Sequence, residues 1–157
     1  MSRAIFNAIA FQDLEALEES LESGASPKAL NEEGIRPLTL IASLIKKSFE
    51  EGEYKEEDMY KKMAAMLIVH GAPEEDLHHA LGEVSNLGHY ICRYVIDLSL
   101  ERQDSRRVVE LIAAKRIWFE DDDEELQAAF IVAIEKGDKS LVDAMFENGD
   151  VHHTYEQ

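Results

Sequence analysis

The sequence predicts an all-α protein in which pairs of helices repeat along the chain and stack into a solenoid. A Gln-Asp or Gly-Asp step between two apolar helical stretches occurs three times, at Asp13, Asp104 and Asp138. Apolar residues recur four and eight positions before and after each aspartate, the spacing of one helix face; they are Ile5, Ile9, Leu17, Leu21, Ile96, Leu100, Val108, Ile112, Phe130, Ile134, Val142 and Phe146. Hydrophobic residues make up 45% of the 157-residue chain, enough for one domain with a continuous core. Because one such helix pair cannot bury its apolar face alone, repetition predicts a stack.

The first unit is predicted over residues 2–33, with helices over residues 4–11 and 13–22. Gly24 is expected to end the second helix, because glycine readily adopts the left-handed conformation common at helix C-termini. The residues that follow are rich in Gly, Pro and Asn, which predicts a loop before the second unit.

The second unit is predicted over residues 34–73. Pro37 is expected to open its first helix, since proline is tolerated in the first turn of a helix. Its second helix is predicted over residues 60–69, ending before Gly71. The charged stretch at residues 46–59 is predicted to be an exposed insertion between the two helices. The glycines that end the second helices of the two units are 47 residues apart, and removing about 14 residues returns the repeat to about 33.

The last two units are predicted over residues 74–115 and 116–151, with a polar tail at residues 152–157. The third unit has three helical stretches where two are expected. The stretch at residues 76–84 is therefore predicted to be an extra helix, separated from the next one by a break at residues 85–88. The remaining helices are expected over residues 89–102, 105–115, 125–136 and 139–148.

The charge balance is strongly acidic, with 33 Asp and Glu against 16 Lys and Arg and a formal net charge of -17. Such a field repels nucleic acid and anionic lipid and favours a partner with a basic surface. Solvated helix faces that only confer solubility would give the same composition. The lone cysteine, Cys92, lies in an apolar stretch and predicts a reducing compartment. No secretory signal and no run of ~20 apolar residues is found, so a cytoplasmic location is expected.

Three kinds of segment recur in these units. Residues 36–42, Arg-Pro-Leu-Thr-Leu-Ile-Ala, open a helix, Gly137-Asp138 forms a turn, and a glycine ending closes residues 21–27, 68–73 and 146–151. With these segments the chain resembles an ankyrin-repeat protein, whose units open with Thr-Pro-Leu-His-x-Ala and close with Leu-Leu-x-x-Gly-Ala-Asp. The copies are degenerate, with Arg36 in place of the Thr and Thr39 in place of the His. Helix-pair repeats of the HEAT type, about 40 to 47 residues long, are the alternative and fit spacings of 47 and 44 residues.

The resemblance implies a non-enzymatic protein, without a cofactor, that binds a partner protein through its loops and concave face. In that family the loops and the first helix of each unit form the binding surface. Carried over residue by residue, the implied partner-binding residues are Glu32, Glu33, Arg36, Glu74, Glu75, Trp118, Phe119, Glu120, Asp121, Asp122 and Asp123.

The acidic run at residues 120–125, directly after Trp118 and Phe119, is the sharpest charge feature of the chain. It lacks the ligand pattern of an EF-hand loop, and the six histidines have no zinc-site spacing, so no metal site is predicted. The run either docks basic groups or is a solvated loop before a helix whose N-terminus favours carboxylates. The aromatic pair either packs against the next unit or anchors a partner. If both face a partner, that partner is basic with an apolar protrusion.

No nucleophile motif, phosphate-binding loop or dinucleotide fingerprint occurs, which argues against an enzyme. The net charge of -17 supports a second hypothesis, an acidic inhibitor that blocks a nucleic-acid-processing enzyme by charge mimicry, as an immunity or antidefence protein would. A mimic needs its carboxylates in one stripe, whereas the carboxylates of a scaffold can be dispersed.

Overall fold

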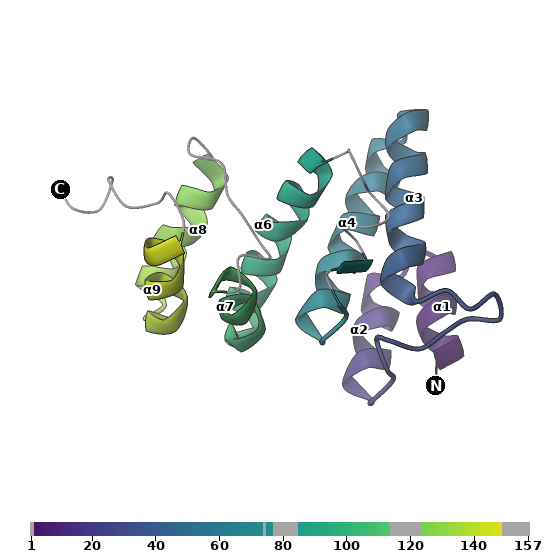
Figure 1. Cartoon of the computed structure of the whole chain (residues 1–157), viewed down its shortest axis with the longest axis horizontal. Coiled ribbons are helices and arrows are strands. Elements are labelled where there is room, and N and C mark those ends of the chain that lie inside the picture. The colour runs from purple at the N-terminus through teal and green to yellow at the C-terminus, as the bar shows by residue number, and fades with distance from the viewer. Residues whose placement is uncertain (1, 74, 77–84, 114–123, 149–157) are drawn as a thin grey trace. The chain divides into compact units, whose positions relative to one another are not determined.

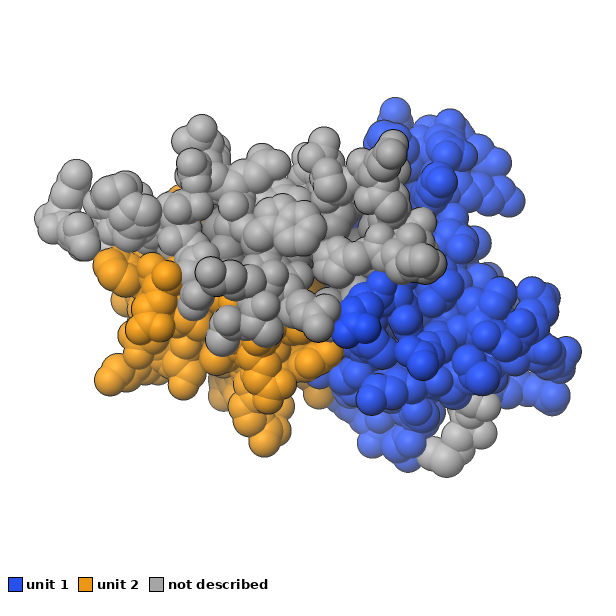
Figure 2. Space-filling model, in the orientation of Figure 1, with its two compact units in different colours: residues 1–91 blue, residues 92–157 orange. Residues whose placement is uncertain are grey.

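A computed structural model describes residues 2–73, 75–76, 85–113 and 124–148 of the chain, and these residues form helices and no strand (Figure 1). The prediction of an all-α fold is confirmed. The chain divides into two compact units, residues 1–91 and 92–157 (Figure 2). The helices are α1 (Ser2–Ala10), α2 (Leu14–Glu22), α3 (Pro37–Glu51), α4 (Tyr54–Val69), α6 (Ser85–Arg102), α7 (Arg106–Ala113), α8 (Glu124–Glu135) and α9 (Lys139–Asn148).

In the first unit, two helical hairpins pack side by side. The helices α1 and α2 form one pair, and α3 and α4 form the other. In addition, α1 contacts α3 and α2 contacts α4, so each helix of the first pair lies beside its counterpart in the second (Figure 1). Full burial of an aliphatic side chain stabilises a fold by roughly 1.5–3 kcal/mol. The largest fully buried side chains of this unit are Ile5, Ile9, Leu17, Leu38, Ile41, Ile45, Met63 and Leu67.

The aspartate steps found in the sequence are the turns between consecutive helices. The residue before each aspartate, Gln12, Gln103 or Gly137, has a left-handed backbone with φ of 54°, 56° and 72°. Its N–H donates to the carbonyl three positions earlier, and the aspartate N–H donates to the carbonyl five positions earlier. This Schellman pattern satisfies the end of the first helix. The aspartate then caps the second helix by accepting from the N–H three positions later, at 3.0 Å for Asp13 and 3.2 Å for Asp138.

The stretch at residues 46–59 is not the inserted loop that its charge predicted. Instead, α3 continues through it to Glu51 and α4 begins at Tyr54, with Gly52 in a left-handed conformation between them (φ 72°). This turn has the same Schellman hydrogen bonds as the other three. The additional residues lengthen both helices, and they are charged because an exposed helix face is polar.

The longer helices project beyond the first pair. Tyr60 of α4 is buried, and its side chain shares a hydrogen bond with that of Gln12, so the α1–α2 turn lies beside the middle of α4. Burial raises the pKa of the Tyr60 hydroxyl, and the bond with Gln12 opposes that rise. The parts of α3 and α4 beyond this contact have no counterpart in the first pair (Figure 1).

In the second unit, α9 contacts both α7 and α8. Two polar contacts join the turn after α6 to the turn after α8. The Ser105 hydroxyl donates to the Asp138 carboxylate at 2.6 Å, and the Lys136 ammonium donates to the Leu100 carbonyl at 3.3 Å. The buried apolar side chains of the unit are Val95, Ile96, Leu100, Val108, Leu111, Ile112, Ala129, Phe130, Ala133, Leu141, Ala144 and Met145.

Two predictions for the later helices are wrong. Residues 85–88 form the first turn of α6 instead of a break, because Ser and Asn are favoured at helix N-termini and a single glycine costs a helix only about 1 kcal/mol. Ile134 and Phe146 were expected in the core but are 37% and 43% exposed. Among the described helices, the main contact of α8 is with α9. The predicted extra helix from residue 77 onward and the predicted tail lie outside the described residues.

Candidate protein-binding surface

The loop between the first two helix pairs ends in a tightly hydrogen-bonded tip. The side-chain oxygen of Asn31 accepts from the N–H groups of Glu33 and Ile35, both at 2.9 Å. The Asn31 N–H donates to the Ile35 carbonyl at 3.0 Å, which closes the tip. Gly34 has a φ of 76°, a conformation that glycine adopts without strain. These bonds fix Glu32 and Glu33 at the end of the loop, where both are exposed.

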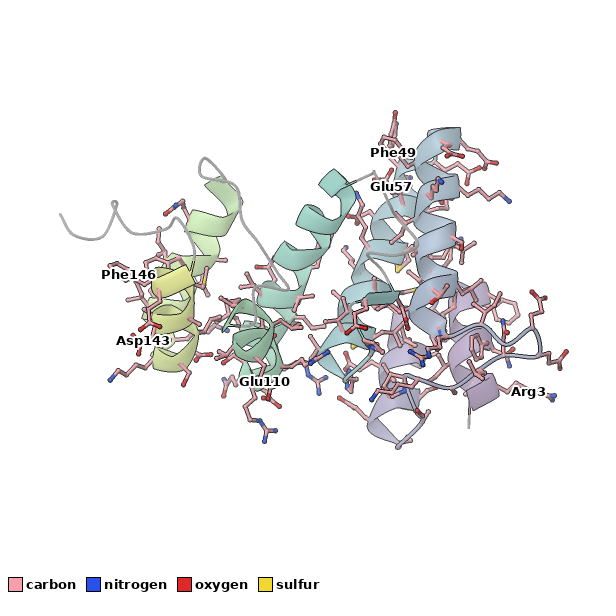
Figure 3. The ribbon with its side chains drawn as sticks, in the orientation of Figure 1. Arg3, Phe49, Glu57, Glu110, Asp143 and Phe146 are labelled. Atoms are coloured by element: carbon pink, nitrogen blue, oxygen red, sulfur yellow. The ribbon has the colours of Figure 1, made fainter. Side chains whose placement is uncertain are left out.

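This tip lies beside the first helix and forms a hollow with it. Arg3, Phe6 and Asn7 of α1 face Leu30, Asn31, Glu32 and Glu33 of the loop across a volume of about 440 Å³, and these seven residues are here called the finger groove. Leu30 is 60% exposed. Figure 3 shows Arg3 projecting from the N-terminal end of α1, on the side of this loop. The groove thus combines the apolar side chains of Phe6 and Leu30 with two carboxylates and the guanidinium of Arg3.

Arg36, predicted to contact a partner protein, forms an ion pair with Asp76 of its own chain. Its guanidinium lies 3.5 Å from the Asp76 carboxylate, and the two side chains are 45% and 17% exposed. The ion pair joins the residue before α3 to the segment after α4, so it ties the two ends of the second helix pair. Glu75, next to Asp76, is exposed as predicted for a contact residue. Such a half-exposed ion pair contributes at most about 1 kcal/mol.

The other predicted contact residues lie outside the described part of the chain. They are Glu74, Trp118, Phe119, Glu120, Asp121, Asp122 and Asp123. The structure therefore brings together Glu32 and Glu33, gives Arg36 an internal partner, and leaves Glu75 at a separate exposed position.

Only Glu32 and Glu33 of the seven groove residues were predicted from the sequence; the other five are Arg3, Phe6, Asn7, Leu30 and Asn31. Arg3, Phe6 and Asn7 meet the loop tip through the packing of α1 against the second helix pair, and no local pattern encodes that packing. Leu30 gave no clear signal, because single exposed apolar residues are common at protein surfaces.

A second acidic surface lies on α2. Glu15, Glu18, Glu19 and Glu22 follow the i, i+3, i+4, i+7 spacing and therefore share one helix face. On α4, which contacts α2, the carboxylate of Asp58 pairs with Lys62 of the same helix at 3.3 Å. The four glutamates of the stripe all lie on one helix.

The described residues offer little for catalysis or metal binding. No three of their His, Cys, Asp or Glu side chains lie close enough together to hold a metal ion. At the start of α7, hydrogen bonds from Arg106 hold the pKa of the Asp104 carboxyl below its usual range, and the same pair raises the pKa of Arg106. The two are 3.1 Å apart at a helix end, a position typical of capping. Within the same residues, no helix has the length and apolar character needed to cross a bilayer.

Comparison of the chain with protein-family models, with curated proteins and with solved structures finds no match.

Proposed function

We propose that this chain is an ankyrin-like stack of helix pairs that binds a partner protein with a basic surface and catalyses no reaction. The arrangement of the first unit supports the stack, because equivalent helices of consecutive pairs lie side by side. The two second helices of that unit also end alike, at Gly24 and Gly71, with φ of 101° and 104° and a buried alanine after each glycine.

The observation that carries the binding function is the finger groove. The backbone that carries its two glutamates is fixed, because the N–H groups of Glu33 and Ile35 donate to the side-chain oxygen of Asn31, so little backbone freedom is lost when a cation binds there. Leu30 supplies the apolar contact that charge alone lacks. A loop tip beside a first helix is also the surface that the ankyrin resemblance implies.

The proposal is tested by charge reversal at the groove. The variant Glu32→Lys/Glu33→Lys should capture its partner from a lysate at least about tenfold less well than the unchanged protein, because two attractions become repulsions. The matched control, Glu15→Lys/Glu19→Lys on α2, changes the net charge equally and should retain the partner. Circular dichroism of both variants verifies that the fold is kept. Retention of the partner by the groove variant would exclude the groove as its binding surface.

The acidic stripe on α2 favours a second candidate function, charge mimicry of nucleic acid by an inhibitor. In that case the partner is a nucleic-acid-processing enzyme, and the variant Glu15→Lys/Glu19→Lys should lose it instead. Duplex DNA would then compete for the captured partner, whereas it would leave a scaffold partner bound. The glutamates of the stripe lie on a single helix, which is why mimicry ranks second.

A further inference from the structure

The hairpin of α3 and α4 exposes two large aromatic side chains at its tip. Phe49, in the last turn of α3, is 49% exposed, and Tyr54, the first residue of α4, is 73% exposed. Figure 3 shows Phe49 at the projecting end of this hairpin, far from the finger groove and Arg3 within the same unit. Aromatic side chains are enriched at protein–protein interfaces relative to the rest of the protein surface.

The residues between the two aromatics are acidic. Glu50 and Glu51 close α3, Glu53 precedes α4, and all three are exposed. The pKa of the Glu53 carboxyl is raised, first by its hydrogen bond with the Glu51 carboxyl and then by repulsion from that group, while Lys47 acts weakly in the opposite direction. Two carboxylates this close repel each other once both are ionised. A cation placed between them removes that repulsion.

The tip is held in place by the fold. The left-handed Gly52 and the Schellman bonds around it fix the turn, with the Glu53 N–H donating to the Ser48 carbonyl at 2.9 Å. Below the tip, Ser48 of α3 and Tyr60 of α4 are buried. A preorganised surface of this kind loses little entropy when it binds.

We propose that this aromatic tip, consisting of Phe49, Glu51, Glu53 and Tyr54, docks an arginine-bearing segment of a partner protein. A guanidinium can donate to two carboxylates at once through its planar fork, and its flat face stacks on an aromatic ring. A lysine ammonium is a compact, strongly hydrated charge that does neither as well. The tip shares no residue with the finger groove, so it binds such a segment whether or not the groove binds a partner.

Two synthetic peptides test the proposal. Each is a blocked dodecapeptide with leucines beside basic residues, and the two differ only in having arginine or lysine at the basic positions. Titration of the ¹⁵N-labelled full chain, followed by NMR, should shift the amides of residues 49–54 first. The arginine peptide should bind several-fold more tightly than the lysine peptide. Phe49→Ala/Tyr54→Ala, and separately Glu51→Gln/Glu53→Gln, should each weaken the arginine peptide by about tenfold and abolish its advantage over the lysine peptide.

Matched variants separate a defined site from general attraction to an acidic protein. Phe11→Ala removes an aromatic side chain that is 81% exposed in the turn between α1 and α2. Glu15→Gln/Glu19→Gln removes two carboxylates from α2. Both should leave the affinity and the preference for arginine unchanged. Equal binding of the two peptides, or equal losses in the tip and control variants, would overturn the proposal. Loss of the partner in the groove variant described above is a separate result, because that variant leaves the tip intact.

Discussion

At the scale of single residues, the helix turns show how a side-chain contact can compensate for an unfavourable backbone. Gln12 and Gln103 occupy left-handed positions that Gly52 and Gly137 occupy in the equivalent turns. A side chain in this conformation costs about 1–2 kcal/mol, because its Cβ crowds the following carbonyl. Gln12 recovers part of that cost through its hydrogen bond with Tyr60.

We therefore expect glycine to stabilise these turns unequally. Gln103→Gly should raise the free energy of unfolding by about 1 kcal/mol, whereas Gln12→Gly should raise it by less, because it also removes the bond with Tyr60. Gly137→Ala, whose new Cβ has nothing within 4 Å beyond its own chain neighbours, should lower stability through backbone strain alone. Urea denaturation of the three variants measures these differences. A stability loss in Gln103→Gly would show that its side chain contributes more than the strain costs.

The ion pair between Glu57 and Lys61 in α4 is buried, with side chains that are 10% and 9% exposed. The second carboxylate oxygen, Glu57 Oε1, is buried and has no hydrogen-bond partner in the described part of the chain. Lys61→Met alone should destabilise the fold by about 3–5 kcal/mol, because it leaves a buried carboxylate unpaired. The double variant Glu57→Leu/Lys61→Met should recover most of this loss. Thermal and urea unfolding of the two single variants and the double variant give the free energies of this double-mutant cycle. If the losses in the single variants add up to the loss in the double variant, Glu57 and Lys61 do not stabilise each other and the pair is effectively solvated.

At the scale of helices, the length of α3 and α4 explains what the repeat pattern could and could not reveal. The spacing of 47 residues between Gly24 and Gly71 indicated about 14 residues more than a repeat of about 33. It could not distinguish a loop from two longer helices, because extending both helices of a hairpin equally leaves the register of the rest unchanged. The charge of residues 46–59 indicated exposure but not conformation.

A proline substitution distinguishes these two forms. Lys47 is exposed within α3, so Lys47→Pro removes a helical hydrogen bond and should cost about 3 kcal/mol with a loss of helical signal in circular dichroism. Lys47→Ala is the control and should be nearly neutral, since alanine favours helices. An exposed loop would tolerate the proline as well as the alanine. If neither variant lowers the free energy of unfolding, residues 46–59 form the exposed insertion that the sequence predicted.

At the scale of the molecule, the sequence predicted the class of fold and part of the surface. Helical periodicity and the aspartate steps sufficed for the all-α fold and for three of the turns, since both are local patterns. The family resemblance led to Glu32 and Glu33, which lie at the loop tip. The rest of the finger groove could not be predicted, because Arg3 and Phe6 meet that loop only through packing between helix pairs. For the same reason Ile134 matched the core pattern yet lies 37% exposed.

The excess of negative charge gives a prediction for the whole chain. With a formal charge of -17, repulsion among carboxylates should destabilise the compact state more than exposed pairs such as Arg36 with Asp76 stabilise it, because such pairs contribute at most about 1 kcal/mol each. Raising NaCl from ~0.01 M to ~0.15 M shortens the screening length from about 30 Å to about 8 Å, and at pH 7 should raise the melting temperature by about 2–4 °C for each kcal/mol of repulsion removed. The control is the same titration near the isoelectric point of about 4.6, where repulsion and attraction balance and the gain should vanish or reverse. A melting temperature that falls with salt at pH 7 would mean that attractive ion pairs outweigh the net charge.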